Sequence, residues 1–131
     1  ESAPVGCVVY NTPRPAQVTV SKSWVVDGVL YANGSQPSGL SAQLQLTGPS
    51  AASASNQGWG VPRTGYKIGE TTTISETTVL SEQFAQCDLT AAVTSVNGVA
   101  VSTPLGSSGY PLSLSQASNT ASVTNTYAGS L

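Results

Sequence analysis

Three polar residues, Lys22, Glu76 and Asn125, occupy positions at which the surrounding pattern calls for an apolar side chain. Each lies in a stretch where alternate residues are mainly apolar. Residues two apart on a β-strand face the same side, so these three side chains should point inward with their neighbours. The neighbours are Val18, Val20, Trp24 and Val26 for Lys22; Ala121, Val123 and Tyr127 for Asn125; and Ile74, Thr78 and Leu80 for Glu76. Charged groups are rarely buried unless they are paired, so the three residues require a joint explanation.

These three residue types can form a covalent cross-link. Burial lowers the pKa of a lysine and makes its neutral, nucleophilic amine accessible. The carboxamide carbon of an asparagine is an electrophile, and a protonated glutamic acid beside it can carry protons to the departing ammonia. The product would be an amide between Lys22 and Asn125, promoted by Glu76, with the fold holding the reactants together. The alternative is an ordinary buried Lys22–Glu76 ion pair with Asn125 hydrogen-bonded alongside.

The elements that position these residues are short β-strands. Strong helix formers are sparse, whereas Val, Thr and aromatic residues recur in alternating runs bounded by turn-forming residues. Asp27-Gly28 and Asn97-Gly98 each predict a tight hairpin. We predict strands at residues 17–26, 40–47, 57–63, 71–80, 88–96, 99–103 and 119–127. About seven short strands separated by turns are typical of an all-β sandwich.

Composition excludes several function classes. The chain has 131 residues, enough for one domain, and carries four Lys and Arg, six Asp and Glu and no His, for a formal net charge of −2. Nucleic-acid binding needs clustered cations, and most nucleophilic triads and many metal sites need His. The apolar runs are too short to cross a membrane. We therefore expect no conventional enzyme, no metal or other cofactor, and neither nucleic acid nor an inserted membrane as a partner.

The two ends of the sequence resemble each other. Cys7-Val8-Val9-Tyr10-Asn11-Thr12 echoes Ala121-Ser122-Val123-Thr124-Asn125-Thr126, and both are strand-like runs that close on Asn-Thr. A tandem array of modules would produce this pattern. Residues 1–15 would then be a segment or linker from a preceding module, residues 16–128 the sandwich and residues 129–131 a C-terminal tail. The alternative is a chance similarity between two strands.

The chain contains two cysteines, Cys7 and Cys87. A cysteine pair in a small, Ser/Thr-rich chain suggests an oxidising, extracellular setting, and we predict a disulfide between the two. It would tie the N-terminal segment to the body of the domain. The alternatives are two buried free thiols, or a partner for Cys7 in another module.

The two terminal strands resemble a known family. Val18-Thr19-Val20-Ser21-Lys22-Ser23-Trp24 and Ala121-Ser122-Val123-Thr124-Asn125-Thr126-Tyr127 look like the opening and closing strands of collagen-adhesin B-type domains. These are prealbumin-like modules of surface adhesins and pilins of Gram-positive bacteria. The run from Val18 to Tyr127 also resembles repeated extracellular modules of large actinobacterial surface proteins.

The resemblance implies a Greek-key sandwich with an internal isopeptide bond. Carried over by motif, Lys22 is the nucleophile, Asn125 the electrophile and Glu76 the acid that shuttles protons. Many family members place this acid before a proline-containing turn, whereas Glu76 precedes Thr77-Thr78-Val79-Leu80. Glu70, which has the same strand parity, is therefore the second candidate for the acid.

Two function classes follow. The first is a mechanical or spacer module of an extracellular, cell-surface stalk or adhesin. It would be monomeric in isolation, with adjacent modules of the same protein as its partners and a single self-cross-linking event as its only chemistry. The second is a ligand-binding sandwich for carbohydrate or a host protein. Its contact residues would be Trp59, which is flanked by Gly58 and Gly60, or exposed tyrosines at Tyr31, Tyr66 and Tyr110.

Overall fold

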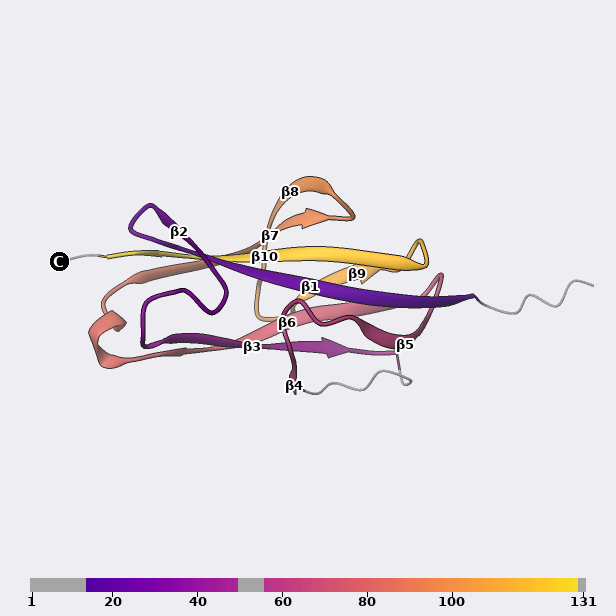
Figure 1. Ribbon diagram of the computed structural model, residues 1–131, viewed down its shortest axis with the longest axis horizontal. Helices are drawn as coiled ribbons and strands as arrows, with labels where there is room; N and C mark the ends of the chain where they lie inside the picture. The colour runs from indigo at the N-terminus through magenta and orange to yellow at the C-terminus, as the bar shows by residue number, and fades with distance from the viewer. Residues whose placement is uncertain (1–13, 50–55, 130–131) are drawn as a thin grey trace, which may run out of the picture.

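The computed structural model describes residues 14–49 and 56–129, whose regular secondary structure consists almost entirely of β-strands (Figure 1). The alternation of apolar and polar residues selects strands because it gives each one a face to bury. The strands are β1 (Pro15–Val26), β2 (Val29–Ala32), β3 (Leu40–Thr47), β4 (Asn56–Gln57), β5 (Arg63–Lys67), β6 (Thr71–Leu80), β7 (Asp88–Val96), β8 (Val99–Pro104), β9 (Tyr110–Ser113) and β10 (Ser118–Ala128).

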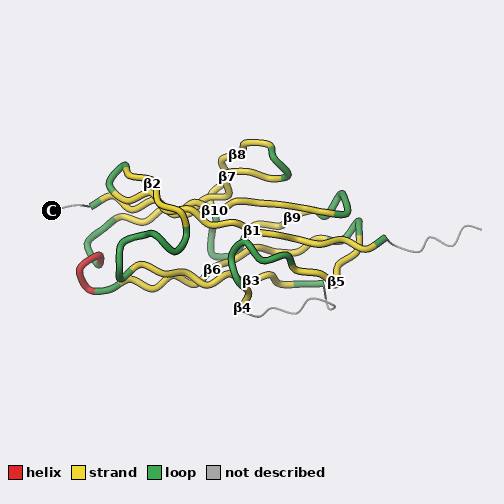
Figure 2. Tube along the Cα trace, viewed as in Figure 1, coloured by secondary structure: helices red, strands yellow, loops and turns green. Residues whose placement is uncertain are grey.

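The strands form two sheets that pack as the layers of a sandwich (Figures 1 and 2). The larger sheet has the order β2-β1-β10-β7-β8, with β5 also paired to β1, and the smaller sheet has the order β4-β3-β6-β9. A 3-10 turn, η2 (Glu82–Phe84), follows β6 on the path to β7 and is the red segment of Figure 2. The predicted all-β sandwich is confirmed.

The first and last strands, β1 and β10, lie side by side and run parallel in the larger sheet (Figure 1). Their register places Lys22 opposite Val123 and Trp24 opposite Asn125. Because both strands run the same way, the described chain enters at one end of the long axis and leaves at the other (Figure 1). This pair therefore lies on the direct route between the two ends of the domain.

The interior divides into a larger and a smaller apolar cluster. The larger one is formed by residues of both sheets, including Val18, Leu46, Ile74 and Val123, and the smaller one by Trp24, Leu40 and Tyr127. On β1 the position between Val20 and Trp24, which belong to different clusters, is taken by Lys22. Lys22 is 5% exposed, so the alternation on β1 continues through a charged residue.

Both predicted hairpins are confirmed. β1 pairs with β2 around Asp27 and Gly28, whose φ angles are 48° and 83°. β7 pairs with β8 around Asn97 and Gly98, whose φ angles are 49° and 81°. Two successive residues with positive φ give a turn whose twist matches that of the flanking strands, which explains the Asp-Gly and Asn-Gly sequences.

The strands differ from the predicted ones in two places. The strand expected at residues 57–63 is replaced by β4 and β5 with a turn between them, in which Gly60 has a φ of 76°. β9, which begins with Tyr110 and Pro111, lies at residues where no strand was predicted. Proline is tolerated there because β9, among the strands that the structure describes, is an edge strand that pairs only with β6.

Hydrogen bonds tie both ends of the described chain to the sandwich. β1 starts at Pro15, and the carbonyl of Arg14 accepts a hydrogen bond of 2.8 Å from the Ile68 backbone, so both residues belong to the sandwich. At the other end, the Gly129 backbone N–H donates to Asp27 Oδ1 at 2.6 Å. The predicted echo in residues 7–12 lies outside the described residues.

We expect Gly109→Ala to destabilise the fold by about 1 to 3 kcal/mol. Gly109 has a φ of 82°, and a Cβ there would lie 2.6 Å from the carbonyl oxygen of Ile74. Chemical denaturation measures the loss. Gly106→Ala is the matched control, because a Cβ at Gly106 meets nothing within 4 Å. Equal stability of the two variants would contradict the prediction.

Candidate functional site

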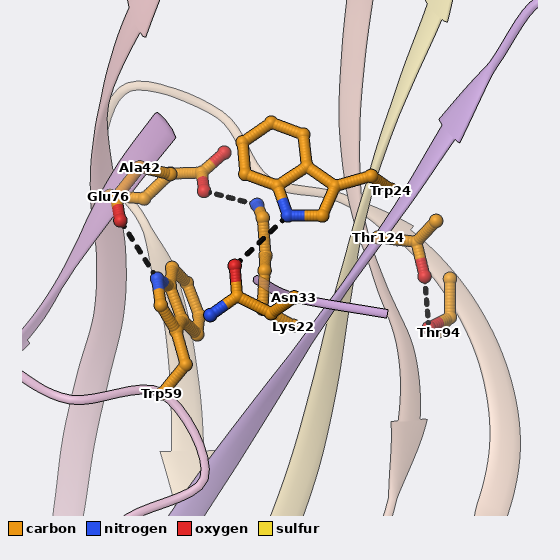
Figure 3. A network of polar contacts seen from close by, with 8 residues as sticks. All are labelled: Lys22, Trp24, Asn33, Ala42, Trp59, Glu76, Thr94 and Thr124. Atoms are coloured by element: carbon orange, nitrogen blue, oxygen red, sulfur yellow. Dashed lines mark hydrogen bonds and ion pairs between the residues drawn. The ribbon is translucent and has the colours of Figure 1, made fainter. Parts of the chain in front are cut away.

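Lys22 and Glu76 meet between the two sheets. Lys22 extends from β1 and Glu76 from β6, and Nζ donates to Oε1 at 2.5 Å (Figure 3). The exposed fractions of the two side chains are 0% and 6%. The ion pair is therefore shielded from solvent. In such a buried position, neither charge would be stable without the other.

Two tryptophans enclose the lysine nitrogen. Nζ lies 4.9 Å from the ring centroid of Trp24 and 4.8 Å from that of Trp59, between the two rings (Figure 3). Both rings are anchored, since Trp24 Nε1 donates to Asn33 Oδ1 at 3.0 Å and Trp59 Nε1 donates to the Ala42 carbonyl at 2.9 Å. The rings exclude water from the amine and restrict where its nitrogen can lie.

Burial changes the protonation of Lys22. It lowers the pKa of the amine from 10.5 to about 8, and the neighbouring Glu76 carboxylate opposes part of this change. With this pKa, roughly a tenth of the amine is neutral at pH 7, far more than for a solvated lysine. Lys22 thus has an accessible nucleophilic form near neutral pH.

Asn125 lies beside this pair on β10 and is 0% exposed. It pairs with Trp24, two positions along β1 from Lys22, and the parallel register puts both side chains on the same face of the sheet. Strand spacing and rise place the Cα atoms of such diagonal neighbours about 8 Å apart. That separation is within the reach of the four-carbon stem of a lysine directed toward its neighbour.

The carboxamide of Asn125 is buried without hydrogen bonds. Neither Oδ1 nor Nδ2 has a partner among the described residues, although buried amides normally have one. The Tyr127 phenol is close enough for Asn125 to oppose the rise that burial causes in its pKa, but the two groups do not form a hydrogen bond of normal geometry. The hydrogen-bonded asparagine that a simple ion-pair site requires is therefore not present in the described part of the chain.

Unpartnered polar atoms concentrate at this site. Of seven buried side-chain atoms without a hydrogen bond in the described ranges, four belong to Glu76, Asn125 and Tyr127. One of them is Oε2 of Glu76, whose other oxygen binds Lys22. Such atoms are costly in a folded protein, and their clustering marks a place where chemistry can occur.

The second candidate for the acid, Glu70, lies elsewhere. It sits in the turn between β5 and β6, where its Oε1 accepts a hydrogen bond of 2.7 Å from the Lys67 backbone N–H. This contact is exposed and closes the turn. Of the two acids considered, the structure brings only Glu76 into contact with Lys22.

The aromatic residues considered for ligand binding are less available than expected. Trp59 is half-buried, packs against the larger apolar cluster and forms one wall around Lys22. Tyr66 is 2% exposed, so its assignment as an exposed contact residue was wrong. Tyr31 and Tyr110 are half-buried. These side chains fill the inward-facing space that the alternating pattern creates.

Cys87 is half-buried and packs against the smaller apolar cluster. Cys7 lies outside the described residues, so the Cys7–Cys87 disulfide stays a prediction.

Several contacts within the site were not anticipated from the sequence. Trp24 and Tyr127, which stack with ring centroids 5.9 Å apart, share the strand faces of Lys22 and Asn125, and that parity was a signal for their proximity. Asn33 precedes Gly34, a dipeptide typical of turns, and this gave no signal for its contact with Trp24. Nothing in the sequence indicated that Trp59 lies over Lys22, because strand parity does not show which loop covers a buried side chain.

Comparison with protein-family models, curated proteins and solved structures finds no match to this chain. Within residues 14–49 and 56–129, no group of three or more His, Cys, Asp or Glu side chains could hold a metal ion. The same part of the chain contains no helix long and apolar enough to span a membrane.

Proposed function

We propose that this domain is a structural module of an extracellular surface stalk or adhesin, stabilised by an amide that it forms between Lys22 and Asn125. One observation carries the proposal: a buried Lys22–Glu76 pair lies beside a buried Asn125 carboxamide that has no hydrogen bonds. The resemblance of β1 and β10 to the terminal strands of collagen-adhesin B-type domains supports the same assignment.

The three side chains contain the groups that the reaction needs. Transfer of one proton from the Lys22 ammonium to the Glu76 carboxylate gives a neutral amine and a neutral acid together. The amine nitrogen attacks Cγ of Asn125 while Glu76 donates a hydrogen bond to the carboxamide oxygen. The Cγ–Nδ2 bond then breaks, and Glu76 relays a proton from the attacking nitrogen to Nδ2, which leaves as ammonia. The reaction occurs once in each chain, because the product is part of the fold.

The position of the bond suits a load-bearing role. Tension applied at the two ends would shear β1 against β10, whose contact otherwise consists of strand hydrogen bonds and side-chain packing. A Lys22–Asn125 amide would carry the force directly between these strands and leave residues 23–124 outside the load path. A module of this kind fits between adjacent modules of the same surface protein.

The mass of the intact protein tests the proposal. We expect it to fall below the sequence mass by one ammonia, apart from any hydrogens lost to a disulfide. Lys22→Ala and Asn125→Ala should each abolish this deficit, whereas Lys67→Ala, which alters an exposed lysine, should retain it. Peptide mapping should recover residues 22 and 125 in one branched peptide. Wild-type protein at full sequence mass would contradict the proposal.

A further inference from the structure

A pocket of about 270 Å³ opens at the side of the sandwich next to the proposed cross-link. Its lining includes Glu76 and Thr78 from β6, Leu89 and Ala91 from β7, and residues 105–107 after β8. The pocket follows from the strand lengths. β9 pairs only with residues 71–74 of β6, so within the described ranges residues 75–80 have no strand on that edge.

The pocket adjoins both the acid and the asparagine of the proposed reaction. Glu76 lines it, and Oε2 of this 6% exposed side chain has no partner while Oε1 binds Lys22. Ala91 also lines it and is the direct neighbour of Asn125 in the register of β7 and β10. Paired residues of adjacent strands face the same side, so Asn125 lies next to a small residue of the pocket lining.

We propose that this pocket is a port for ammonia-sized amines, through which the ammonia released from Asn125 leaves and a small primary amine can enter. This inference rests on the proposed function and adds a substrate class to the same site. An entering alkylammonium ion would bind the Glu76 carboxylate, as the Lys22 ammonium does. In a chain that lacks the lysine amine, it would take the place of that amine in the reaction with Asn125.

The step is balanced in the same way as the internal reaction. The ammonium ion gives one proton to Glu76 and becomes a neutral amine. A bond forms between the amine nitrogen and Cγ of Asn125, and the Cγ–Nδ2 bond breaks. The nitrogen loses a second proton, which Glu76 relays to Nδ2, and Nδ2 leaves as ammonia. The product is an N-alkylamide at residue 125, and no oxidant or reductant is needed.

The experiment uses the Lys22→Ala chain with methylamine, which reproduces the terminal carbon and nitrogen of a lysine side chain. We expect the intact mass to rise by one methylene group, with peptide mapping placing the methylamide at Asn125 and not at Asn119. Asn119 is equally buried on β10, but its Nδ2 donates to two backbone carbonyls. The Lys22→Ala/Glu76→Gln chain should not react.

Two further arms test the route of entry. Isobutylamine, a bulkier primary amine whose nitrogen is bonded to an unhindered CH2 carbon, should react at least about tenfold more slowly than methylamine. Thr78→Phe in the Lys22→Ala background should slow methylamine by a similar factor, with Thr78→Val as the control and circular dichroism as the check of folding. The amine comparison needs no second substitution, so it decides the question even if Thr78→Phe does not fold.

The outcomes separate this inference from the proposed function. A wild-type chain that loses ammonia, combined with a Lys22→Ala chain that does not take up methylamine, would overturn the port and leave the cross-link in place. Equal rates for the two amines, or a folded Thr78→Phe chain that reacts as fast as Thr78→Val, would overturn it as well. Full mass in the wild type would overturn the proposed function.

Discussion

The Asn125→Ala variant should be less stable than the wild-type protein by about 4 to 5 kcal/mol, the value for opening a covalent loop of about a hundred residues. For a domain of this size the loss corresponds to a fall in Tm on the order of 15 to 20 °C. Lys22→Ala should lose the same cross-link, and in addition it leaves Glu76 buried without its counter-charge. Thermal and denaturant unfolding measure both effects.

The size of the stability loss in Asn125→Ala is diagnostic because the carboxamide makes no hydrogen bonds in the described part of the chain. Without a covalent bond, replacing a buried and unpaired polar group by a methyl group would relieve a desolvation cost that is offset mainly by the cavity created. The change in stability would then be small. Wild-type stability in Asn125→Ala would therefore contradict the cross-link.

Asn119→Ala is the matched control on the same strand. Its Nδ2 donates to the Gln17 and Gln116 carbonyls at 3.2 and 2.7 Å, so its loss should cost about 1 to 3 kcal/mol through ordinary hydrogen bonds. The mass deficit of one ammonia should remain. We expect Asn125→Ala to lose both stability and the mass deficit, and Asn119→Ala to lose stability alone. This difference separates a covalent contribution from a general sensitivity of β10 to substitution.

The strands that carry the site could be predicted because two-residue alternation is a local property of the sequence. On β1, β6 and β10, Lys22, Glu76 and Asn125 share a face with apolar residues two positions away, so their inward direction could be predicted from parity. β3, β6 and β7 occur at the predicted residues for the same reason.

What lies across the interior could not be predicted in this way. Parity shows which face a residue takes but not which element covers that face. Trp59 lies over Lys22 because its loop is attached to β1 by a backbone hydrogen bond of 2.7 Å from Gly60 to Val20, a contact between distant segments. The pocket depends on the β6–β9 pairing, which covers only Thr71 to Ile74 of β6 in the described residues, and alternation within one strand does not show how far its partner extends.

The rate of cross-link formation should fall about tenfold for each pH unit above about 8. This limit follows from the pKa of Lys22, which burial lowers to about 8. The reactive state, a neutral amine beside a protonated Glu76, contains the same single proton as the ion pair. Above about pH 8 the pair loses that proton, so the amine is neutral but Glu76 is a carboxylate that cannot donate. An uncatalysed lysine would behave oppositely and react faster as the pH rises toward its usual pKa of about 10.4.

The measurement starts from chain prepared in unfolded form by chemical synthesis, diluted from denaturant into buffers between about pH 7 and pH 10 and quenched in acid at intervals. Intact mass gives the fraction that has lost ammonia, and circular dichroism shows that the chain is folded at each pH. Glu76→Gln keeps the size of the side chain but cannot carry a proton, so it should not react at any pH. Glu70→Gln should react like the wild type, because Glu70 binds the backbone of its own turn. A wild-type rate that rises through pH 9 and 10 would show that the lysine reacts without the acid, and a slow Glu70→Gln variant would assign the acid to Glu70.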